Sequence, residues 1–270
     1  MKLRGFRLGQ GTWNMGDDPA RRREELAALR AGIELGMTLL DTAEMYGDGR
    51  SESLVGEAIA GQRDQITLVS KVLPQNASRK GVARACEASL ARLKTDRLDL
   101  YLLHWSGPHP LEETVRGFED LLAAGKIRAW GVSNLDLGDM RQLIALRGGK
   151  ACATNQVLYN LSRRGIEFDL LPWSQENRIP VMAYSPIEQG RILGRKALLE
   201  VAQQLGATPA QVALAWVLRQ SDVVAIPKAG RVAHVRENHG ALGVKLDKAA
   251  LAALDKAFPA PKGPRPLEMI

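Results

Sequence analysis

Short apolar runs alternate with longer amphipathic stretches along the whole chain, and this alternation is the strongest constraint on its fold. Several runs, Leu98–Trp105 above all, are apolar without clean alternation, as expected for parallel strands covered on both faces. The stretches between them carry apolar residues at spacings of three and four, the pattern of a helix with one buried face. The eight runs are Leu8–Trp13, Thr38–Ala43, Ile66–Val72, Leu98–Trp105, Ile127–Asn134, Ala153–Tyr159, Pro180–Ile187 and Val223–Lys228.

Eight strands that are each followed by a helix predict a parallel sheet with right-handed crossovers. Within 270 residues they predict an α/β fold of the closed (β/α)8 type, a TIM barrel. The alternative is an open doubly wound sheet, but Gly9–Gly11 is followed by Thr-Trp-Asn rather than by a glycine-opened helix. No linker-like segment divides the chain, so we expect a single domain over 1–270. Beyond the eighth strand, Val232–Leu242 and Lys248–Phe258 predict extra C-terminal helix.

Local signals mark several helix ends. The stretch Pro19–Gly36 has Asp18 as a predicted N-cap, proline at its first position and glycine as a predicted C-cap. The segment Thr208–Gln211 has the pattern of a capping box and opens a helix that runs through Trp216. Cys86 belongs to an apolar stripe at helical spacing, so we expect Cys86 and Trp216 to lie in the core.

Lys and Arg outnumber Asp and Glu by 37 to 30, a net charge of +7. The basic residues are interleaved with acidic ones on helical stretches, as on a solvated helix face. The sequence has no basic tail, no interleaving of aromatic and basic residues and no zinc-finger spacing, which argues against a nucleic-acid partner. An anionic small molecule remains open as a ligand.

The two cysteines, Cys86 and Cys152, are too few for a disulfide framework and favour a reducing compartment. The first residues lack an apolar signal segment, and no apolar stretch approaches the roughly 18 residues that span a membrane. We therefore expect a cytoplasmic protein without a membrane partner, and a monomer rather than an oligomer.

Polar side chains gather where the predicted strands end, and in a barrel these ends form one rim that carries the chemistry. A single Asp, Lys or His there would more often be a cap, a surface charge or a core residue, so the convergence is what indicates a site. Tyr46 follows the second strand in a short loop. The strand-end residues are Asp41, Lys71, His104, Asn134, Gln156, Tyr184, Ser185 and Lys228.

This set of groups predicts carbonyl reduction. The pKa of a tyrosine is near 10, and a neighbouring ammonium such as Lys71 favours the phenolate and lowers that pKa. Asp41 would hold the ammonium, so that Tyr46 becomes a general acid for an oxygen that gains negative charge, with His104 donating a second hydrogen bond. No cluster has metal-ligand spacing, and the G-x-S-x-G elbow of many serine hydrolases is absent.

Seven segments resemble the aldo-keto reductase superfamily, in order and at that family's spacing over the whole chain. They are LLDTAEMYGDG, VSKV, YLLHW, KIRAWGVSN, NQVLYN, AYSPI and AIPKAGRVAHVRENHGAL. The segments SRRGIEFDLLPW and YSPIEQG are similar to a bacterial branch that contains methylglyoxal reductases. The resemblance implies NADPH-dependent reduction of small aldehydes and 2-oxoaldehydes, with hydride passing from the nicotinamide to the carbonyl carbon.

Carried over residue by residue, the resemblance implies a catalytic tetrad of Asp41, Tyr46, Lys71 and His104. It also implies residues along the cofactor, from the carboxamide and nicotinamide ring through the pyrophosphate to the 2′-phosphate and adenine. In that order they are Ser133, Asn134 and Gln156; Tyr184; Ser185, Ile187 and Gln189; Lys228; and Glu237 with Asn238.

The sequence departs from the family pattern at the adenosine end. His234 stands where an arginine is usual, and Ala229 replaces a usual serine. Histidine is only partly charged at neutral pH, so we expect NADPH preference with a weaker phosphate clamp. Arg231, at a predicted helix start where backbone N–H groups also favour anions, is expected to compensate.

The resemblance places Trp13, Met45 and Trp105 in an apolar wall beside the nicotinamide; the alternative for the tryptophans is a plain core position. The loop Trp105–Leu111 and the C-terminal tail are short for the family, which implies an open pocket and small substrates. Three other functions stay open: reduction of larger keto-sugars or aromatic aldehydes, a Schiff-base aldolase that uses Lys71, and a non-catalytic NADPH-binding regulator.

Overall fold

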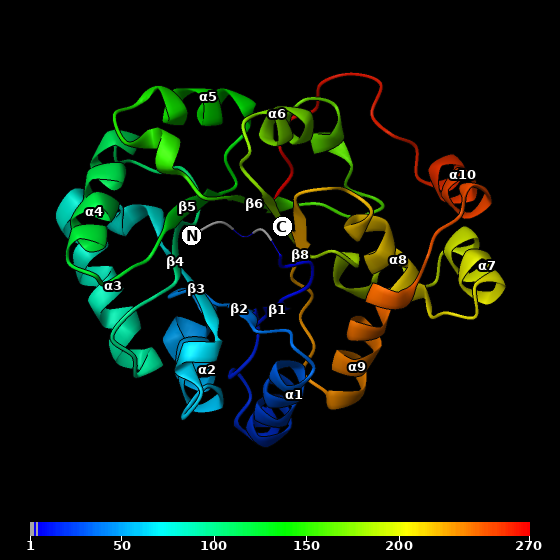
Figure 1. The fold of residues 1–270 in the computed structure, drawn as a ribbon, viewed down its shortest axis with the longest axis horizontal. Helices are drawn as coiled ribbons and strands as arrows, with labels where there is room; N and C mark the ends of the chain where they lie inside the picture. The colour runs from blue at the N-terminus through cyan, green and yellow to red at the C-terminus, as the bar shows by residue number, and fades with distance from the viewer. Residues whose placement is uncertain (1–2, 4) are drawn as a thin grey trace.

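Eight parallel strands follow one another around the sheet in chain order (Figure 1). The structure, a computed structural model, describes residue 3 and residues 5–270. The strands are β1 (Gln10–Gly11), β2 (Leu39–Asp41), β3 (Thr67–Val72), β4 (Leu100–Leu103), β5 (Trp130–Ser133), β6 (Asn155–Leu158), β7 (Val181–Tyr184) and β8 (Val223–Ala225).

The sheet closes between its first and last strands. Leu8 bridges Ala225 and Gly11 bridges Lys228, both in parallel, and the Gly11 N–H donates to the carbonyl of Pro227 at 3.1 Å. The predicted barrel is therefore confirmed, and the open doubly wound alternative is wrong.

Helices surround the strands on the outside (Figure 1). They are α1 (Arg22–Glu34), α2 (Arg50–Ala58), α3 (Arg79–Leu93), α4 (Leu111–Ala123), α5 (Leu137–Ala145), α6 (Leu170–Glu176), α7 (Lys196–Gln204), α8 (Pro209–Leu218), α9 (Val232–Gly240) and α10 (Lys248–Ala257). The helix α7, which precedes the predicted capping box, was not predicted. The two C-terminal helices were predicted, although α9 ends earlier than expected and continues as a 3-10 turn over Ala241–Gly243.

The predicted helix ends are largely observed. The Asp18 side chain accepts a hydrogen bond from the Ala20 N–H, but the first turn, Pro19–Arg21, is 3-10 rather than α-helical. Leu35 rather than Gly36 is the C-cap of α1, and Gly36 follows at φ +85°, a left-handed conformation that glycine adopts freely. Cys86, in α3, is fully buried as predicted.

Side-chain alternation builds two core layers. Along β4, Leu100 and Leu102 point into the barrel while Tyr101 and Leu103 point outward to the helices. Leu3 is buried with the inward-pointing group, so the barrel interior is a packed core rather than a channel. The strand ends therefore form a mouth above solid packing.

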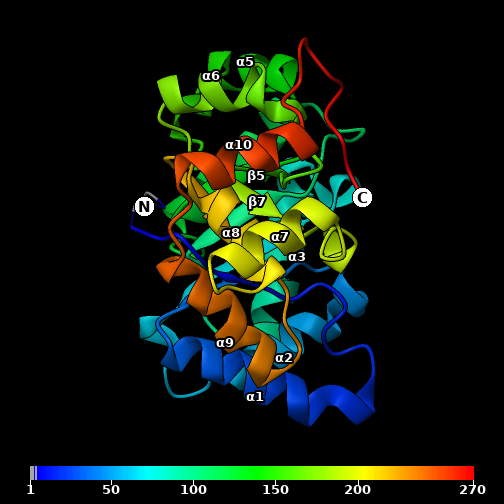
Figure 2. The same ribbon diagram turned by 90° about the vertical axis from the view of Figure 1, so that its right-hand side faces the viewer.

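After α10 the chain returns across the barrel and ends over its centre (Figure 1, Figure 2). Within residues 3 and 5–270, no helix has both the length and the apolar character needed to cross a membrane.

The capping box of α8 gives a test of local stability. The Thr208 hydroxyl accepts from the Gln211 N–H at 3.2 Å, and the Gln211 side chain accepts from the Thr208 N–H at 3.0 Å. We expect Thr208→Ala to lower the free energy of unfolding by about 1 kcal/mol, because a helix N–H loses its acceptor. Urea denaturation measures this, with Thr208→Ser as the control that keeps the hydroxyl. Equal stability of the Ala variant and the wild type would contradict it.

Candidate active site

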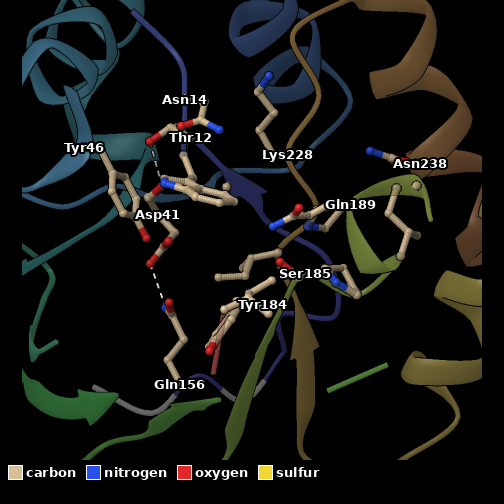
Figure 3. Close-up of a pocket in the computed structure, with 18 of the residues that line it drawn as sticks. Thr12, Asn14, Asp41, Tyr46, Gln156, Tyr184, Ser185, Gln189, Lys228 and Asn238 are labelled. Atoms are coloured by element: carbon tan, nitrogen blue, oxygen red, sulfur yellow. Dashed lines mark hydrogen bonds between the residues drawn. The ribbon is translucent and has the colours of Figure 1, made fainter. Parts of the chain in front are cut away.

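A cavity of about 570 Å³ opens at the carboxyl-terminal mouth of the barrel (Figure 3). The loops after the strands line it, together with one face of α9 and the end of the chain. Of the predicted site residues, Trp13, Asp41, Met45, Tyr46, His104, Trp105, Ser133, Asn134, Gln156, Tyr184, Ser185, Ile187, Gln189, Lys228, His234, Glu237 and Asn238 line this cavity. The structure therefore brings residues from positions 13 to 238 of the chain to one place.

Lys71 lies beneath the cavity rather than in its wall, with a side chain that is 0% exposed. Its ammonium nitrogen donates to Asp41 Oδ2 at 2.8 Å, to the carbonyl of Thr42 at 2.8 Å and to the hydroxyl of Tyr46 at 3.1 Å. An ammonium has three protons to donate, so this buried group has a full set of acceptors.

Opposing effects act on the pKa of Lys71. Burial lowers it, but the charge of Asp41 and the contact with Tyr46 together outweigh burial, so the pKa of Lys71 is raised above its ordinary value. The lysine is therefore protonated at neutral pH.

The phenol of Tyr46 corrects one expectation. Burial, with a smaller contribution from Asp41, raises its pKa, while the charge and hydrogen bond of Lys71 lower it. The net pKa is raised, so the expected net acidification is wrong, although Lys71 does act in the predicted direction. Tyr46 consequently keeps its proton at neutral pH, as a general acid must.

His104 lies beside this phenol. The two rings are 5.8 Å apart at an interplanar angle of 72°. Burial and the charge of Lys71 lower the pKa of His104 to about 2. The imidazole is therefore neutral and has one N–H to donate, as expected for a second donor to a substrate oxygen.

A chain of hydrogen bonds joins the predicted nicotinamide-binding residues to Asp41. The Tyr184 hydroxyl donates to Asn134 Oδ1 at 3.0 Å, and Asn134 Nδ2 donates to the Ser133 hydroxyl at 3.1 Å. The Ser133 hydroxyl donates to the carbonyl of Gln156 at 2.8 Å, and Gln156 Nε2 donates to Asp41 Oδ1 at 2.7 Å. Asp41 thus holds Lys71 with one oxygen and Gln156 with the other; Figure 3 shows the second contact.

The loop after β7 has an unusual backbone. Ser185, Glu188 and Gln189 have φ values of 46°, 49° and 54°, in the left-handed region that non-glycine residues rarely adopt. The buried Glu188 carboxylate fixes this loop by accepting hydrogen bonds from Arg191 at 2.9 Å and Arg163 at 3.1 Å. Burial raises the pKa of Glu188, but its hydrogen bonds outweigh burial and the net pKa is lowered.

Two residues that the sequence places at the adenosine end do not line the cavity. Arg231 does not line the cavity; its side chain is 61% exposed and lies 3.4 Å from Glu24. Ala229 is half-buried against the core. Lys228, in contrast, lines the cavity, as do His234 and Asn238.

At the opposite end the apolar wall is accessible. Trp13 is 40% and Met45 is 38% exposed, and Trp105 is half-buried, so the alternative of plain core tryptophans is wrong. The short C-terminal tail was expected to leave the pocket open. The structure differs in that the tail reaches the mouth, where Met269 and Ile270 line the cavity. Leu267 packs on the core and Glu268 pairs with Arg163 at 2.5 Å, which leads the tail to the mouth. The tail has no periodic pattern, so no local signal indicates that it reaches the cavity.

Thr12 and Asn14 also line the cavity and were not predicted. The Thr12 hydroxyl donates to the carbonyl of Asp41 at 2.9 Å and so joins the ends of β1 and β2. Their place directly after the first strand was the available signal. Among the part of the chain that the structure describes, no group of three or more His, Cys, Asp or Glu residues could hold a metal ion.

The barrel, with a tyrosine hydroxyl above a buried lysine–aspartate pair at its mouth, has the architecture of a barrel oxidoreductase. The family model described as the aldo/keto reductase family matches residues 7–258. Methylglyoxal reductase YeaE of Escherichia coli is 58% identical over 268 residues, which cover 97% of this chain and 94% of that protein. The NADH-specific methylglyoxal reductase of Escherichia coli is 31% identical over 301 residues, covering 90% and 91% respectively.

A solved structure gives the same family. The crystal structure of an aldo/keto reductase from Klebsiella pneumoniae in complex with NADP and acetate superposes with a TM-score of 0.96 at 52% identity, covering 97% of this chain and 95% of that chain. The chain belongs to the aldo/keto reductase family and is an oxidoreductase.

The raised Tyr46 pKa gives a pH test. If Tyr46 is the acid and acts while protonated, kcat/KM for carbonyl reduction should stay level through neutral pH and fall only at a pH above the ordinary pKa of tyrosine. In Lys71→Met the lowering effect on the phenol is lost, so we expect the fall to move to higher pH and the plateau to drop by about 100-fold. A pH–rate profile measures both, with NADPH binding as the control for folding. A fall centred near pH 7 in the wild type would contradict the assignment.

Proposed function

We propose that the protein reduces small aldehydes and 2-oxoaldehydes, methylglyoxal among them, with NADPH. The observation that carries the proposal is the Tyr46 phenol, which Lys71 contacts from below and which faces the cavity beside a neutral His104. The identity to methylglyoxal reductase YeaE and the NADP in the Klebsiella pneumoniae structure support the substrate class and the cofactor.

The residues present fit a dinucleotide. Amide and hydroxyl groups, an aromatic ring and a lysine line the cavity, and Lys228 lies on the far side of it from Gln156 and Tyr184 (Figure 3). Ser133, Asn134 and Gln156 would hold the carboxamide, and the Tyr184 ring would stack on the nicotinamide, which supplies a hydride when reduced. Further along, Ser185, Ile187 and Gln189 would follow the pyrophosphate, Lys228 would meet the 2′-phosphate, and Glu237 with Asn238 would contact adenine.

The chain's own groups move the proton. Tyr46 donates its hydroxyl proton to the substrate oxygen as that oxygen gains negative charge, and His104 donates a hydrogen bond to the same oxygen. The phenolate that remains is stabilised by the Lys71 ammonium at 3.1 Å. Asp41 keeps that ammonium charged, so each member of the tetrad has a separate task.

The apolar wall favours a small substrate. Trp13, Met45 and Trp105, with Met269 and Ile270 from the tail, would enclose the carbonyl carbon and exclude water from the reacting group. Exclusion of water strengthens the interaction of the developing charge with Tyr46 and His104.

A Schiff-base aldolase is disfavoured. An amine must be neutral and reachable to attack a carbonyl. The Lys71 side chain is 0% exposed, its pKa is raised and its protons are all used in hydrogen bonds. We also propose, from the sequence, that the protein acts as a monomer in the cytoplasm; sedimentation equilibrium that gives a dimer mass would contradict the first part.

Replacement of the acid tests the mechanism. We expect Tyr46→Phe to lower kcat by about 100-fold to 10,000-fold, because the substrate oxygen loses its proton donor. The Kd for NADPH, measured by fluorescence quenching, should change by less than about twofold, since the hydroxyl is expected to contact substrate rather than cofactor. Unchanged turnover would exclude Tyr46 as the acid.

A substrate screen tests the reaction. NADPH oxidation should be fastest with methylglyoxal and other small aldehydes, and slower with aromatic aldehydes and keto-sugars. No oxidation with any of them would favour a non-catalytic NADPH-binding regulator.

The Kd for NADPH should be lower than that for NADH, and equal values, or a tighter NADH complex, would contradict the assigned role of Lys228.

A further inference from the structure

Cationic side chains from two distant parts of the chain meet beyond the adenosine end of the cavity. The helices α1 and α9 lie side by side (Figure 1). Arg21 ends the 3-10 turn before α1, and Arg231 is the N-cap of α9. Lys228 extends toward the same region from the loop after β8, away from Tyr184 (Figure 3). Arg21 was not among the predicted site residues.

The buried Gly230 shows how closely two of these cations approach. A Cβ atom at Gly230 would lie 2.9 Å from Arg21 Nη2 and 3.6 Å from Lys228 Nζ. A Cβ atom that close to Arg21 Nη2 would clash, so Arg21 lies directly against Gly230 because this position has no side chain, and the Lys228 ammonium lies close to the same position. In keeping with this, burial and then the charge of Arg21 lower the pKa of Lys228.

Carboxylates balance only part of this charge. Glu24 lies 3.9 Å from Arg21 Nε and 3.4 Å from Arg231 Nε, so one carboxylate serves two guanidinium groups. Glu25 is buried, and its Oε2 accepts from the Gly16 N–H at 2.8 Å. Asp17, whose charge raises the pKa of Lys228, pairs with Arg50 at 3.1 Å. Glu24, Arg21 and Arg231 are all substantially exposed, so their ion pairs are weak and exchangeable.

We propose that Arg21 is one of the cations that bind the adenosine 2′-phosphate. In the absence of the cofactor Glu24 pairs with Arg21 and Arg231, and the phosphate takes the place of Glu24 when NADPH binds. This inference rests on the proposed placement of the 2′-phosphate at Lys228. It accounts for His234 at a position where an arginine is usual, since the guanidinium that the clamp needs comes from the turn before α1 instead.

The chemistry favours the exchange. A guanidinium presents paired N–H donors that match phosphate oxygens, and a phosphate carries more negative charge than a carboxylate. A dianionic group beside Lys228 Nζ therefore draws Arg21 more strongly than Glu24 does. NADH lacks this phosphate, so Arg21 and Glu24 should act on NADPH selectively.

Equilibrium titration with both cofactors tests the inference. Arg21→Gln should raise the Kd for NADPH about tenfold and that for NADH by less than twofold, because only NADPH has the partner phosphate. Glu24→Gln should lower the Kd for NADPH about threefold without changing that for NADH, because the internal competitor is removed. The opposite signs of these two effects separate the inference from general damage to the fold.

The neighbouring Arg22 is the matched control. Arg22 is also an arginine and is next to Arg21 in the chain, but its Nη2 pairs with Glu57 at 2.5 Å. Arg22→Gln should leave the ratio of the two Kd values unchanged, and an effect as large as that of Arg21→Gln would overturn the inference. Calorimetry with adenosine 2′,5′-bisphosphate and adenosine 5′-monophosphate repeats the comparison with probes that differ only in the 2′-phosphate.

Lys228→Met separates this inference from the proposed function. If Lys228→Met weakens NADPH selectively and Arg21→Gln does not, the role of Arg21 is overturned and the placement of the phosphate stands. If neither variant changes the ratio of the NADPH and NADH Kd values, the placement at Lys228 fails, and the role of Arg21 fails with it.

Discussion

The buried ammonium of Lys71 is the constraint on which the site depends. A charge removed from water destabilises a fold by several kcal/mol unless it is paired and hydrogen-bonded. Asp41, the carbonyl of Thr42 and the hydroxyl of Tyr46 meet this need, and they come from β2 and the loop after it. The contacts that make burial of Lys71 tolerable also fix the position of the phenol. One set of hydrogen bonds therefore stabilises the barrel mouth and orients the Tyr46 phenol.

Asp41 extends this constraint across the barrel. Its second oxygen accepts from Gln156, and hydrogen bonds continue from there through Ser133 and Asn134 to Tyr184. Asp41, Lys71 and Tyr46 are consequently joined to the cavity wall proposed for the nicotinamide in one connected network on a packed interior. Such a network holds its side chains in fixed positions before a ligand arrives, which is what electrostatic stabilisation of a developing charge requires.

Much of the fold followed from the sequence because parallel strands and covering helices have different periods, and eight such units fill the chain. The helix α7 was missed because no cap signal marks its start, and its N-cap Arg195 makes no side-chain hydrogen bond. Most of the predicted site residues line one cavity, because strand ends converge in a barrel whatever the loops do. The direction of the shift in the Tyr46 pKa was not predicted, since it depends on how the effect of burial compares with that of the Lys71 charge.

The order of the strands, the polar residue at each strand end and the family pattern that relates them could be read from the amino-acid sequence, because these depend on local period and spacing. The three-dimensional packing was needed to show that Lys71 is fully buried under the cavity, that Met269 and Ile270 reach the mouth, and that Arg21 lies beside Lys228. Those contacts join residues far apart in the chain through packing of α1 on α9 and of the tail on the core. No local pattern encodes such a contact, since it arises from the summed packing of the whole barrel.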